Sequence, residues 1–342
     1  MSGNDGVDEL VVTHSALRLV DFFDLATGTR VARLEDLIAE PHEMAYNRAA
    51  GEVYVASTYR TGAYGQPPEN ERSHEITVLD VGSRTVVDVI DTAPFVGPHD
   101  LEYDASRGLL YASLEPNAQG DNGVLVVDAA ARKVLGNIPT PGRNSHWMTI
   151  APDGTRAFVA HKEAGFVSVV DLESRTVADT IDLPGGGEEI DVSPDGSAVY
   201  IATPVIDRAL DEDIARRSAL AKIDVASGAV VTSLPLTPSN HALRVTADNR
   251  VLVAQMIDFH GGPHGYLHVV DGDSMELLGS VALQGLPFTV RATPDSSTAY
   301  VANFGSGTVS VVDLERIAVV DVWDSTAGAA PGLHGMCLVQ RP

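Results

Sequence analysis

A unit of 42 to 57 residues recurs along the chain, and the same position of the unit is a histidine in five of its seven copies. Repetition at such a period is typical of propellers and solenoids. In a closed ring of repeats, equivalent positions face a common axis, so we expect the residues at this position to face one another. We call them the ring residues: His42, His99, His146, Glu188, His241, Phe288 and His334.

Each copy of the unit reads as four short strands separated by turns. In the third copy, the apolar stretches 146–150 and 157–160 flank the turn sequence Pro152-Asp153-Gly154, and such residues favour a strand, a tight turn and a strand. An aromatic residue lies twelve positions after the ring residue in five copies, which fixes the register: Tyr54, Tyr111, Phe158, Tyr200 and Tyr300.

The seventh copy is split between the two ends of the chain. Pairing of the two ends removes exposed strand edges. We therefore predict an all-β fold, a seven-bladed β-propeller of four-stranded antiparallel blades, whose ring is closed by N- and C-terminal strands that share one blade. The predicted single domain spans 1–342, with blades at about 41–92, 96–139, 143–183, 186–235, 238–282, 286–324, and 333–340 with 8–36.

Three sequence motifs of the sixth copy indicate a family. They are Thr-Pro-Asp-Ser at 293–296, Tyr-Val-Ala-Asn at 300–303 and Thr-Val-Ser-Val-Val-Asp at 308–313. They resemble the unit of the YVTN-repeat, YncE-like seven-bladed propellers, and the resemblance covers nearly the whole chain. It implies the fold but not one function, because such propellers serve many roles. The family unit usually has no histidine at the ring position, so this departure is the functional clue.

Composition narrows the class of partner. The chain has a net charge of −24, and such a surface repels phosphate backbones and anionic membranes, so we expect neither nucleic acid nor a membrane as partner. The single cysteine, Cys337, allows no intramolecular disulfide, and we expect it to be a buried inert thiol. The N-terminus has neither a basic region nor an apolar stretch. We expect a cytoplasmic protein that acts on a small molecule, in an oligomeric state that stays open.

Six ring residues can bind a metal ion. Imidazole nitrogen and carboxylate oxygen suit Fe, Cu, Zn, Ni or Mn rather than Ca or Mg. Fe or Cu is favoured, because a histidine-rich site with an open side, here at Phe288, suits redox chemistry; Zn or Mn remains the alternative. Six ligands exceed the usual set for one ion, so the number of ions stays open. The candidate ligands are His42, His99, His146, Glu188, His241 and His334.

Residues in and around the ring are candidates for catalysis and substrate binding. Glu188 is the candidate base, with His146 and His241 as catalytic imidazoles. Charged residues beside the ring, such as Glu43 and Glu189, are interpreted as salt-bridged channel lining or, alternatively, as carboxylates that orient imidazoles. Arginines among them can bind a substrate carboxylate. The candidate substrate contacts are Arg244, Arg291, Phe288, Trp147, His161, His14 and Tyr59.

Three insertions follow the second strands of copies one, four and five, at about 58–73, 204–219 and 256–266. We expect them on the face where the ring residues lie, and long loops beside a site often bind ligands. The second insertion includes 207–217, a possible short helix. The first and third supply three further contact candidates, Tyr64, His260 and His264.

These residues support three hypotheses. The favoured one is a metal-dependent oxidoreductase or oxygenase that acts on a small organic substrate. The second is a metal-assisted lyase, isomerase or hydrolase, resembling the propeller lyases that open macrocyclic lactones. The third is a non-catalytic metal-binding or interaction propeller. Bound iron or copper favours the first, and zinc or manganese the second.

Overall fold

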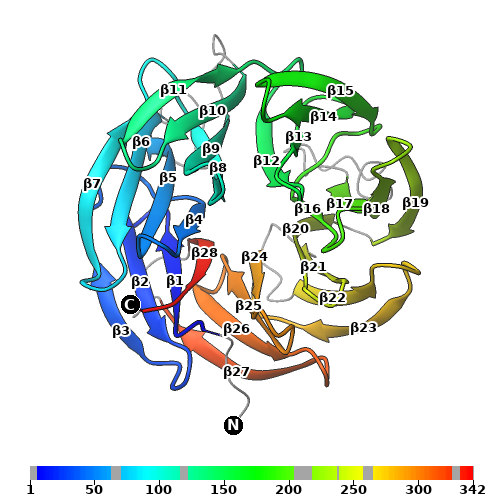
Figure 1. The fold of residues 1–342 in the computed structure, drawn as a ribbon. Coiled ribbons are helices and arrows are strands. Elements are labelled where there is room, and N and C mark those ends of the chain that lie inside the picture. The colour runs from blue at the N-terminus through cyan, green and yellow to red at the C-terminus, as the bar shows by residue number, and fades with distance from the viewer. Residues whose placement is uncertain are drawn as a thin grey trace. The chain divides into compact units, whose positions relative to one another are not determined.

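The computed structural model describes residues 6–62, 71–115, 122–203, 218–236, 239–256, 265–325 and 332–341, and of 239–241 it describes the backbone alone. These residues form 28 strands in seven four-stranded antiparallel sheets (Figure 1). The predicted all-β, seven-bladed propeller is therefore confirmed. Among the described residues, no helix is long and apolar enough to cross a membrane.

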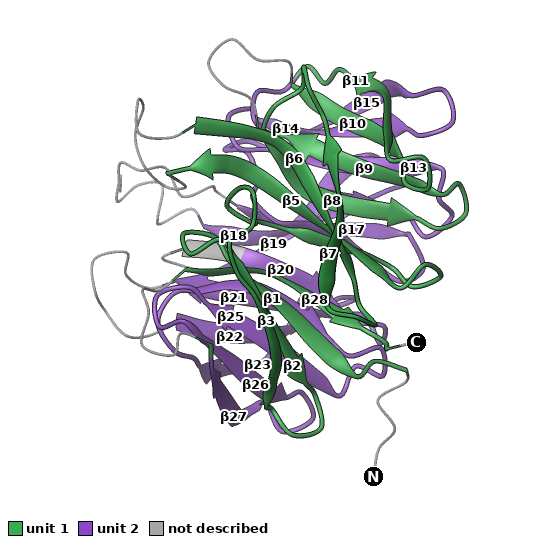
Figure 2. Cartoon of the chain, turned by 90° about the vertical axis from the view of Figure 1, so that its left-hand side faces the viewer, with its two compact units in different colours: residues 1–141, 325–342 green, residues 142–324 purple. Residues whose placement is uncertain are grey.

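The chain divides into two compact units, coloured in Figure 2. Unit 1 comprises residues 1–141 and 325–342 and holds three sheets. Two sheets are each built from consecutive strands: β4 (Met44–Asn47), β5 (Glu52–Thr61), β6 (Glu71–Asp80) and β7 (Thr85–Asp91), then β8 (Pro98–Asp104), β9 (Leu109–Leu114), β10 (Gly123–Asp128) and β11 (Lys133–Ile138). The third sheet has the order β28 (Leu333–Val339), β1 (Glu9–His14), β2 (Leu19–Asp24) and β3 (Arg30–Leu34).

Unit 2 comprises residues 142–324 and holds four sheets, each built from consecutive strands. The prediction of a single domain stays a prediction. The first two sheets contain β12 (Ser145–Ile150), β13 (Arg156–His161), β14 (Phe166–Asp171) and β15 (Thr176–Asp182), then β16 (Ile190–Val192), β17 (Ala198–Thr203), β18 (Ala219–Asp224) and β19 (Ala229–Pro235). The others contain β20 (Ser239–Val245), β21 (Arg250–Met256), β22 (Gly265–Asp271) and β23 (Leu277–Ala282), then β24 (Pro287–Ala292), β25 (Thr298–Asn303), β26 (Thr308–Asp313) and β27 (Ala318–Asp324).

The two ends of the chain meet in one sheet, as the split repeat predicts. Strand β28 pairs antiparallel with β1, with Glu9 opposite Val339 and Val12 opposite Met336. The register shifts between Val12 and His14, so Thr13 lies at an irregularity of the ladder. Cys337 of β28 is buried, as expected of a structural thiol.

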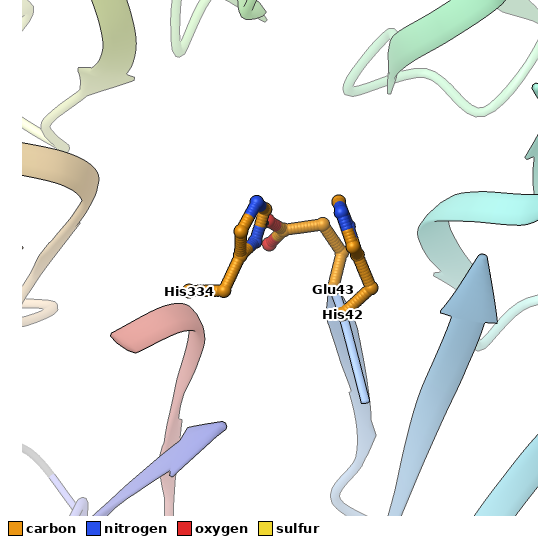
Figure 3. A group of neighbouring side chains, drawn as sticks. All are labelled: His42, Glu43 and His334. Carbon is orange, nitrogen blue, oxygen red and sulfur yellow. Dashed lines mark ion pairs between the residues drawn. The ribbon is translucent and has the colours of Figure 1, made fainter. Parts of the chain in front are cut away.

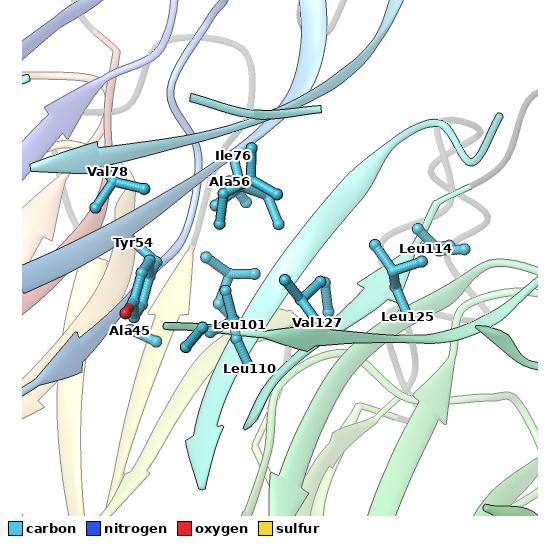
Figure 4. Close-up of a cluster of buried hydrophobic side chains, with 13 residues drawn as sticks. Ala45, Tyr54, Ala56, Ile76, Val78, Leu101, Leu110, Leu114, Leu125 and Val127 are labelled. Carbon is cyan, nitrogen blue, oxygen red and sulfur yellow. The ribbon is translucent and has the colours of Figure 1, made fainter. Parts of the chain in front are cut away.

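Apolar residues of neighbouring sheets form the cores between them. In unit 1, one core cluster includes Tyr54 and Ile76 of the β4–β7 sheet and Leu110 and Leu125 of the β8–β11 sheet (Figure 4). All four side chains are at most 1% exposed. Burying such a side chain stabilises a fold by about 1.5–3 kcal/mol, so these contacts hold adjacent blades together.

The third strand of each sheet, counted from its innermost strand, ends at an aspartate that closes the following turn. In each case the carboxylate accepts a hydrogen bond from the backbone N–H three residues further on. Aspartate is favoured in turns because its short side chain can bond the nearby backbone in this way. The seven residues are Asp24, Asp80, Asp128, Asp171, Asp224, Asp271 and Asp313.

The outermost strands of the sheets expose apolar side chains. Val86 and Val87 of β7 are 44% and 51% exposed, and Val320 of β27 is 54% exposed. On both strands an exposed aspartate, Asp88 or Asp321, accepts a hydrogen bond of 2.8 Å from the backbone N–H of the next residue. Asp179 of β15 does the same. These backbone donors are therefore satisfied within their own strand.

Two leucines on adjacent strands of one sheet test the core. Leu125 of β10 is fully buried and Leu135 of β11 is 44% exposed. We expect Leu125→Ala to lower the free energy of unfolding by about 2–5 kcal/mol. Leu135→Ala should change it by less than about 0.5 kcal/mol. Denaturant titration followed by tryptophan fluorescence measures both, and equal losses would contradict the core assignment.

Candidate metal centre and neighbouring sites

Three ring histidines of unit 1 lie together. His42 directly precedes Glu43 and β4, His99 lies in β8 and His334 in β28. The ring centroids of His42 and His334 are 3.7 Å apart, and those of His42 and His99 are 4.4 Å apart. Each of the three is 2–3% exposed. Residues far apart in the sequence thus form one buried imidazole cluster.

Glu43 completes this cluster (Figure 3). Its Oε1 atom lies 2.7 Å from Nδ1 of His334. One ligand atom from each of His42, Glu43 and His334 lies within 4.8 Å of the others, and all three residues are buried. Two imidazoles and a carboxylate are a donor set that suits transition metals. We call His42, Glu43 and His334 the metal cluster.

The backbone around the metal cluster is closely packed. His42 N donates to Ala56 O and Ala56 N donates to Glu43 O, both at 2.8 Å, which fixes this segment against β5. On the other side, Gly335 approaches so closely that a Cβ atom there would lie 2.1 Å from the carbonyl oxygen of His42. Only glycine therefore allows β28 to bring His334 to this position without displacing the backbone.

In unit 2, His146 and Glu188 form a second buried contact. Nδ1 of His146 lies 2.8 Å from Oε2 of Glu188, and Nζ of Lys162 lies 3.2 Å from Oε1. Glu188 is 1% exposed, so Lys162 and His146 together compensate a buried carboxylate. Lys162 is absent from the sequence candidates; its only signal is its place directly after β13.

The other ring positions of unit 2 are apolar or only partly described. Phe288 packs against Phe304 with ring centroids 5.0 Å apart. Trp147 is 3% exposed and meets His146 edge-on at 6.2 Å. His241 belongs to β20, but its side chain lies outside the described residues.

Charged residues after the ring position of the β16–β19 sheet bond other sheets of unit 2. Glu189 accepts a hydrogen bond of 2.8 Å from Leu243 N and lies 3.4 Å from Nη1 of Arg291. Asp191 accepts one of 2.8 Å from Val245 N and lies 3.5 Å from Nε of Arg244. These contacts agree with a salt-bridged lining. A role for either arginine in binding substrate stays a prediction.

His14 is fully buried and belongs to a charged network of unit 1. Its Nε2 lies 2.7 Å from Ser325 Oγ and 3.4 Å from Asp21 Oδ2. Arg33 donates two hydrogen bonds to Asp21, and Ser325 donates a third. Burial alone would raise the pKa of Asp21, but the hydrogen bonds from Arg33, His14 and Ser325 hold it well below its usual range.

His161 has an equivalent place in unit 2. Its Nε2 lies 2.8 Å from Ser168 Oγ and its Nδ1 lies 3.4 Å from Ser145 Oγ. Asn303 likewise donates to Ser310, at 2.9 Å, seven residues along the chain. His161 is 0% exposed, and burial lowers its pKa to about 4. It is therefore a neutral link between strands, and contact with a substrate stays a prediction.

Tyr59 links two blades of unit 1. Its hydroxyl donates to Oε2 of Glu115 at 3.0 Å, and the guanidinium of Arg72, which pairs with the same carboxylate, lies 4.3 Å from the Tyr59 ring centroid. Tyr59 is 7% exposed. Residues 63–70, 204–217 and 257–264 lie outside the described residues, and with them Tyr64, His260, His264 and the predicted helix.

Comparison with known proteins finds distant relatives of the chain. No family model matches the sequence. The chain is 34% identical over 79 residues to the uncharacterized protein YncE of Salmonella typhimurium, over 23% of this chain and 22% of that protein. It is 28% identical over 148 residues to the 6-phosphogluconolactonase of Enterobacter sp. (strain 638), over 42% of this chain and 44% of that enzyme. The chain is a distant homologue of the YncE-like seven-bladed β-propellers.

Solved structures resemble this YncE-like propeller along most of its length. A functionally unknown protein of Desulfotomaculum acetoxidans superposes with a TM-score of 0.74 at 13% identity, over 98% of this chain and all of that chain. Hydrazine synthase of Kuenenia stuttgartiensis superposes with a TM-score of 0.70 at 16% identity, over 88% of this chain and 94% of that chain. The dihydro-heme d1 dehydrogenase NirN superposes with a TM-score of 0.63 at 18% identity, over 95% of this chain and 65% of that chain. At these identities the likeness shows the fold alone. The curated matches span less than half of each relative's length, and the relatives include enzymes.

Substitution of Gly335 tests the close approach at the metal cluster. We expect Gly335→Ala to destabilise the YncE-like propeller by about 1–3 kcal/mol, because the new methyl group meets backbone atoms that cannot turn away. Gly165→Ala is the control, since the nearest atom to a Cβ there is 3.7 Å away. Thermal unfolding followed by circular dichroism measures both, and equal stability of the two variants would refute the assignment.

The buried His161 predicts a pH dependence of stability. Its folded pKa is depressed to about 4 from 6.5, so between these values the unfolded state binds a proton that the folded state excludes. Stability is therefore lost as pH falls through this window, by at most about 1.4 kcal/mol per pH unit. His161→Asn, which copies Asn303, should remove this part of the slope. Denaturant titrations of both proteins from pH 4 to pH 7 measure it, and parallel curves would contradict it.

Proposed function

We propose that this propeller is a metal-dependent enzyme whose transition metal is bound by His42, Glu43 and His334. The observation that carries the proposal is the convergence of these three buried side chains, with ligand atoms within 4.8 Å of one another. Burying two imidazoles and a carboxylate together is costly unless they are paired or coordinate a cation. A bound metal would supply Lewis acidity or electron transfer.

The residues around the cluster suit this role. Glu43 lies within hydrogen-bond distance of Nδ1 of His334, and such a contact orients an imidazole and raises its basicity. His99 adds a third imidazole beside His42. We extend the proposal to His99 as a further ligand in unit 1. Within unit 2, we propose His146, Glu188 and His241 as a separate group of candidate ligands or catalytic residues. Fe or Cu is favoured because imidazole suits both metals and both support redox chemistry, and Zn or Mn is the alternative.

The favoured reaction is oxidation of a small organic substrate. A largely imidazole donor set suits Fe or Cu, the metals of redox chemistry. With a net charge of −24, the protein is proposed to act on small molecules rather than on nucleic acid.

A metal-assisted lyase, isomerase or hydrolase is the second candidate, and one contact favours it. In the Lys162–Glu188–His146 group, the carboxylate lies 2.8 Å from Nδ1 of the imidazole. A carboxylate in this position orients an imidazole and stabilises its protonated form, as in general acid–base catalysis. We propose that His146 transfers the proton within this group of unit 2.

Metal analysis tests the proposed function. Protein purified without a histidine tag should contain about one equivalent of a transition metal, measured by plasma mass spectrometry. His42→Ala and His334→Ala should lose it because each removes a ligand. His74→Ala should keep it, because His74 is partly exposed and pairs with Asp91 instead. Iron or copper would direct assays to oxidation and zinc or manganese to lyase and hydrolase reactions. Equal metal content in all four proteins would refute the site.

A further inference from the structure

The metal cluster joins two parts of the chain that come from opposite ends of the sequence. His334 belongs to β28, the C-terminal strand, which pairs with β1 in the sheet shared by the chain ends. His42 and Glu43 directly precede β4 in the neighbouring sheet of the same unit. The cluster is therefore complete only while β28 is docked between β1 and the segment that carries His42.

One hydroxyl group bonds both of these parts. Oγ1 of Thr13 donates to the carbonyl oxygen of His42 at 2.9 Å and accepts from the backbone N–H of Gly335 at 2.8 Å. The Gly335 carbonyl oxygen lies further away, at 3.3 Å. Thr13 is fully buried, and the register shift between Val12 and His14 places it at this junction. The backbone of His42 and the backbone of Gly335, which directly follows His334, are thus both bonded to Oγ1 of Thr13.

We propose that the metal holds β28 against the segment that carries His42 and Glu43, and that Thr13 is the positioning residue that links metal binding to the docking of β28. The proposal rests on the metal site proposed above. A ligand that binds only one state stabilises that state in proportion to its saturation. Undocking of β28 removes His334 from the cluster, so the metal favours the docked strand. By the same linkage, a misplaced β28 weakens metal binding.

Hydrogen exchange tests the effect of the metal on β28. Zn(II) alone is the probe, added to metal-free protein at ten times its dissociation constant, and exchange of the β28 and β1 amides is measured by mass spectrometry. The amides of β28 should exchange about tenfold more slowly with zinc. In His334→Ala the added zinc should have no effect on them. Amides of β14, in the other unit, serve as the internal control.

Substitutions at Thr13 test its positioning role. Thr13→Val keeps the shape and removes the hydroxyl, so the affinity for Zn(II) should fall by about 10–100-fold. Thr13→Ser should restore it. Thr77→Val is the matched control, because Thr77 is 1% exposed and lies in the same unit, on β6. Calorimetric titration gives the affinities, and the visible spectrum of the Co(II)-substituted protein reports a changed ligand geometry that a mere loss of stability would not produce.

The outcomes separate the two proposals. If the wild-type protein binds no Zn(II) or Co(II), both proposals fail. If binding depends on His42 and His334 but leaves exchange of β28 unchanged, the metal site stands and the link to β28 is overturned. Equal affinity in Thr13→Val and wild type overturns the role of Thr13. Should Thr13→Val fail to fold, the exchange comparison between wild type and His334→Ala still decides the link.

Discussion

The antiparallel pairing of β28 with β1 determines where His334 of the metal cluster lies. It joins residues as distant in sequence as Glu9 and Val339. The entropy cost of closing a loop grows only with the logarithm of its length, so such a distant pairing costs little more than a shorter one. In return, the sheet of the chain ends gains its fourth strand, and His334 reaches His42. The same ladder thus completes a blade and assembles a site.

Buried charge in both units is compensated by specific partners. Asp21 is bonded by Arg33, Ser325 and His14, Glu188 by Lys162 and His146, and Glu189 by a backbone N–H and Arg291. A buried carboxylate without such partners would cost several kcal/mol. Arg33, Lys162 and Arg291 are therefore cations that compensate buried carboxylates in an acidic chain.

Much of the fold could be predicted from the sequence because a repeat multiplies weak signals. The aromatic residue twelve positions after the ring residue in five copies and the Pro-Asp-Gly turn of the third copy indicated the strands. The split of the seventh copy between the two ends of the chain predicted the role of β28. His14, His161 and Asn303 occupy equivalent positions of the repeat, at the ends of β1, β13 and β25. Their partners seven residues later depend on side-chain orientation across a strand pair, which the pattern of apolar residues does not encode.

The candidate site was predictable as a set of positions but not as contacts. A repeat says which residues are equivalent, and the proximity of His42, His99 and His334 followed from that. It does not say that Glu43 lies against His334, because that contact depends on rotamers. Nor could the repeat predict the role of Thr13. This residue bonds the backbones of His42 and Gly335 at the point where the register between β1 and β28 shifts. The repeat could not predict the contact of Lys162 either, because its partner, Glu188, comes from the next blade.

The outermost strands bear on how this protein behaves among its own copies. An exposed strand edge with valines is a template for pairing with another chain. Here Asp88, Asp179 and Asp321 each occupy a backbone donor of the strand on which they lie, and they add to a net charge of −24. The first effect is local and indifferent to salt, whereas the second is repulsion that ions screen over about 8–10 Å at physiological ionic strength. Concentrated salt would therefore weaken the repulsion between copies of the protein and leave the bonded backbone donors of these strands in place.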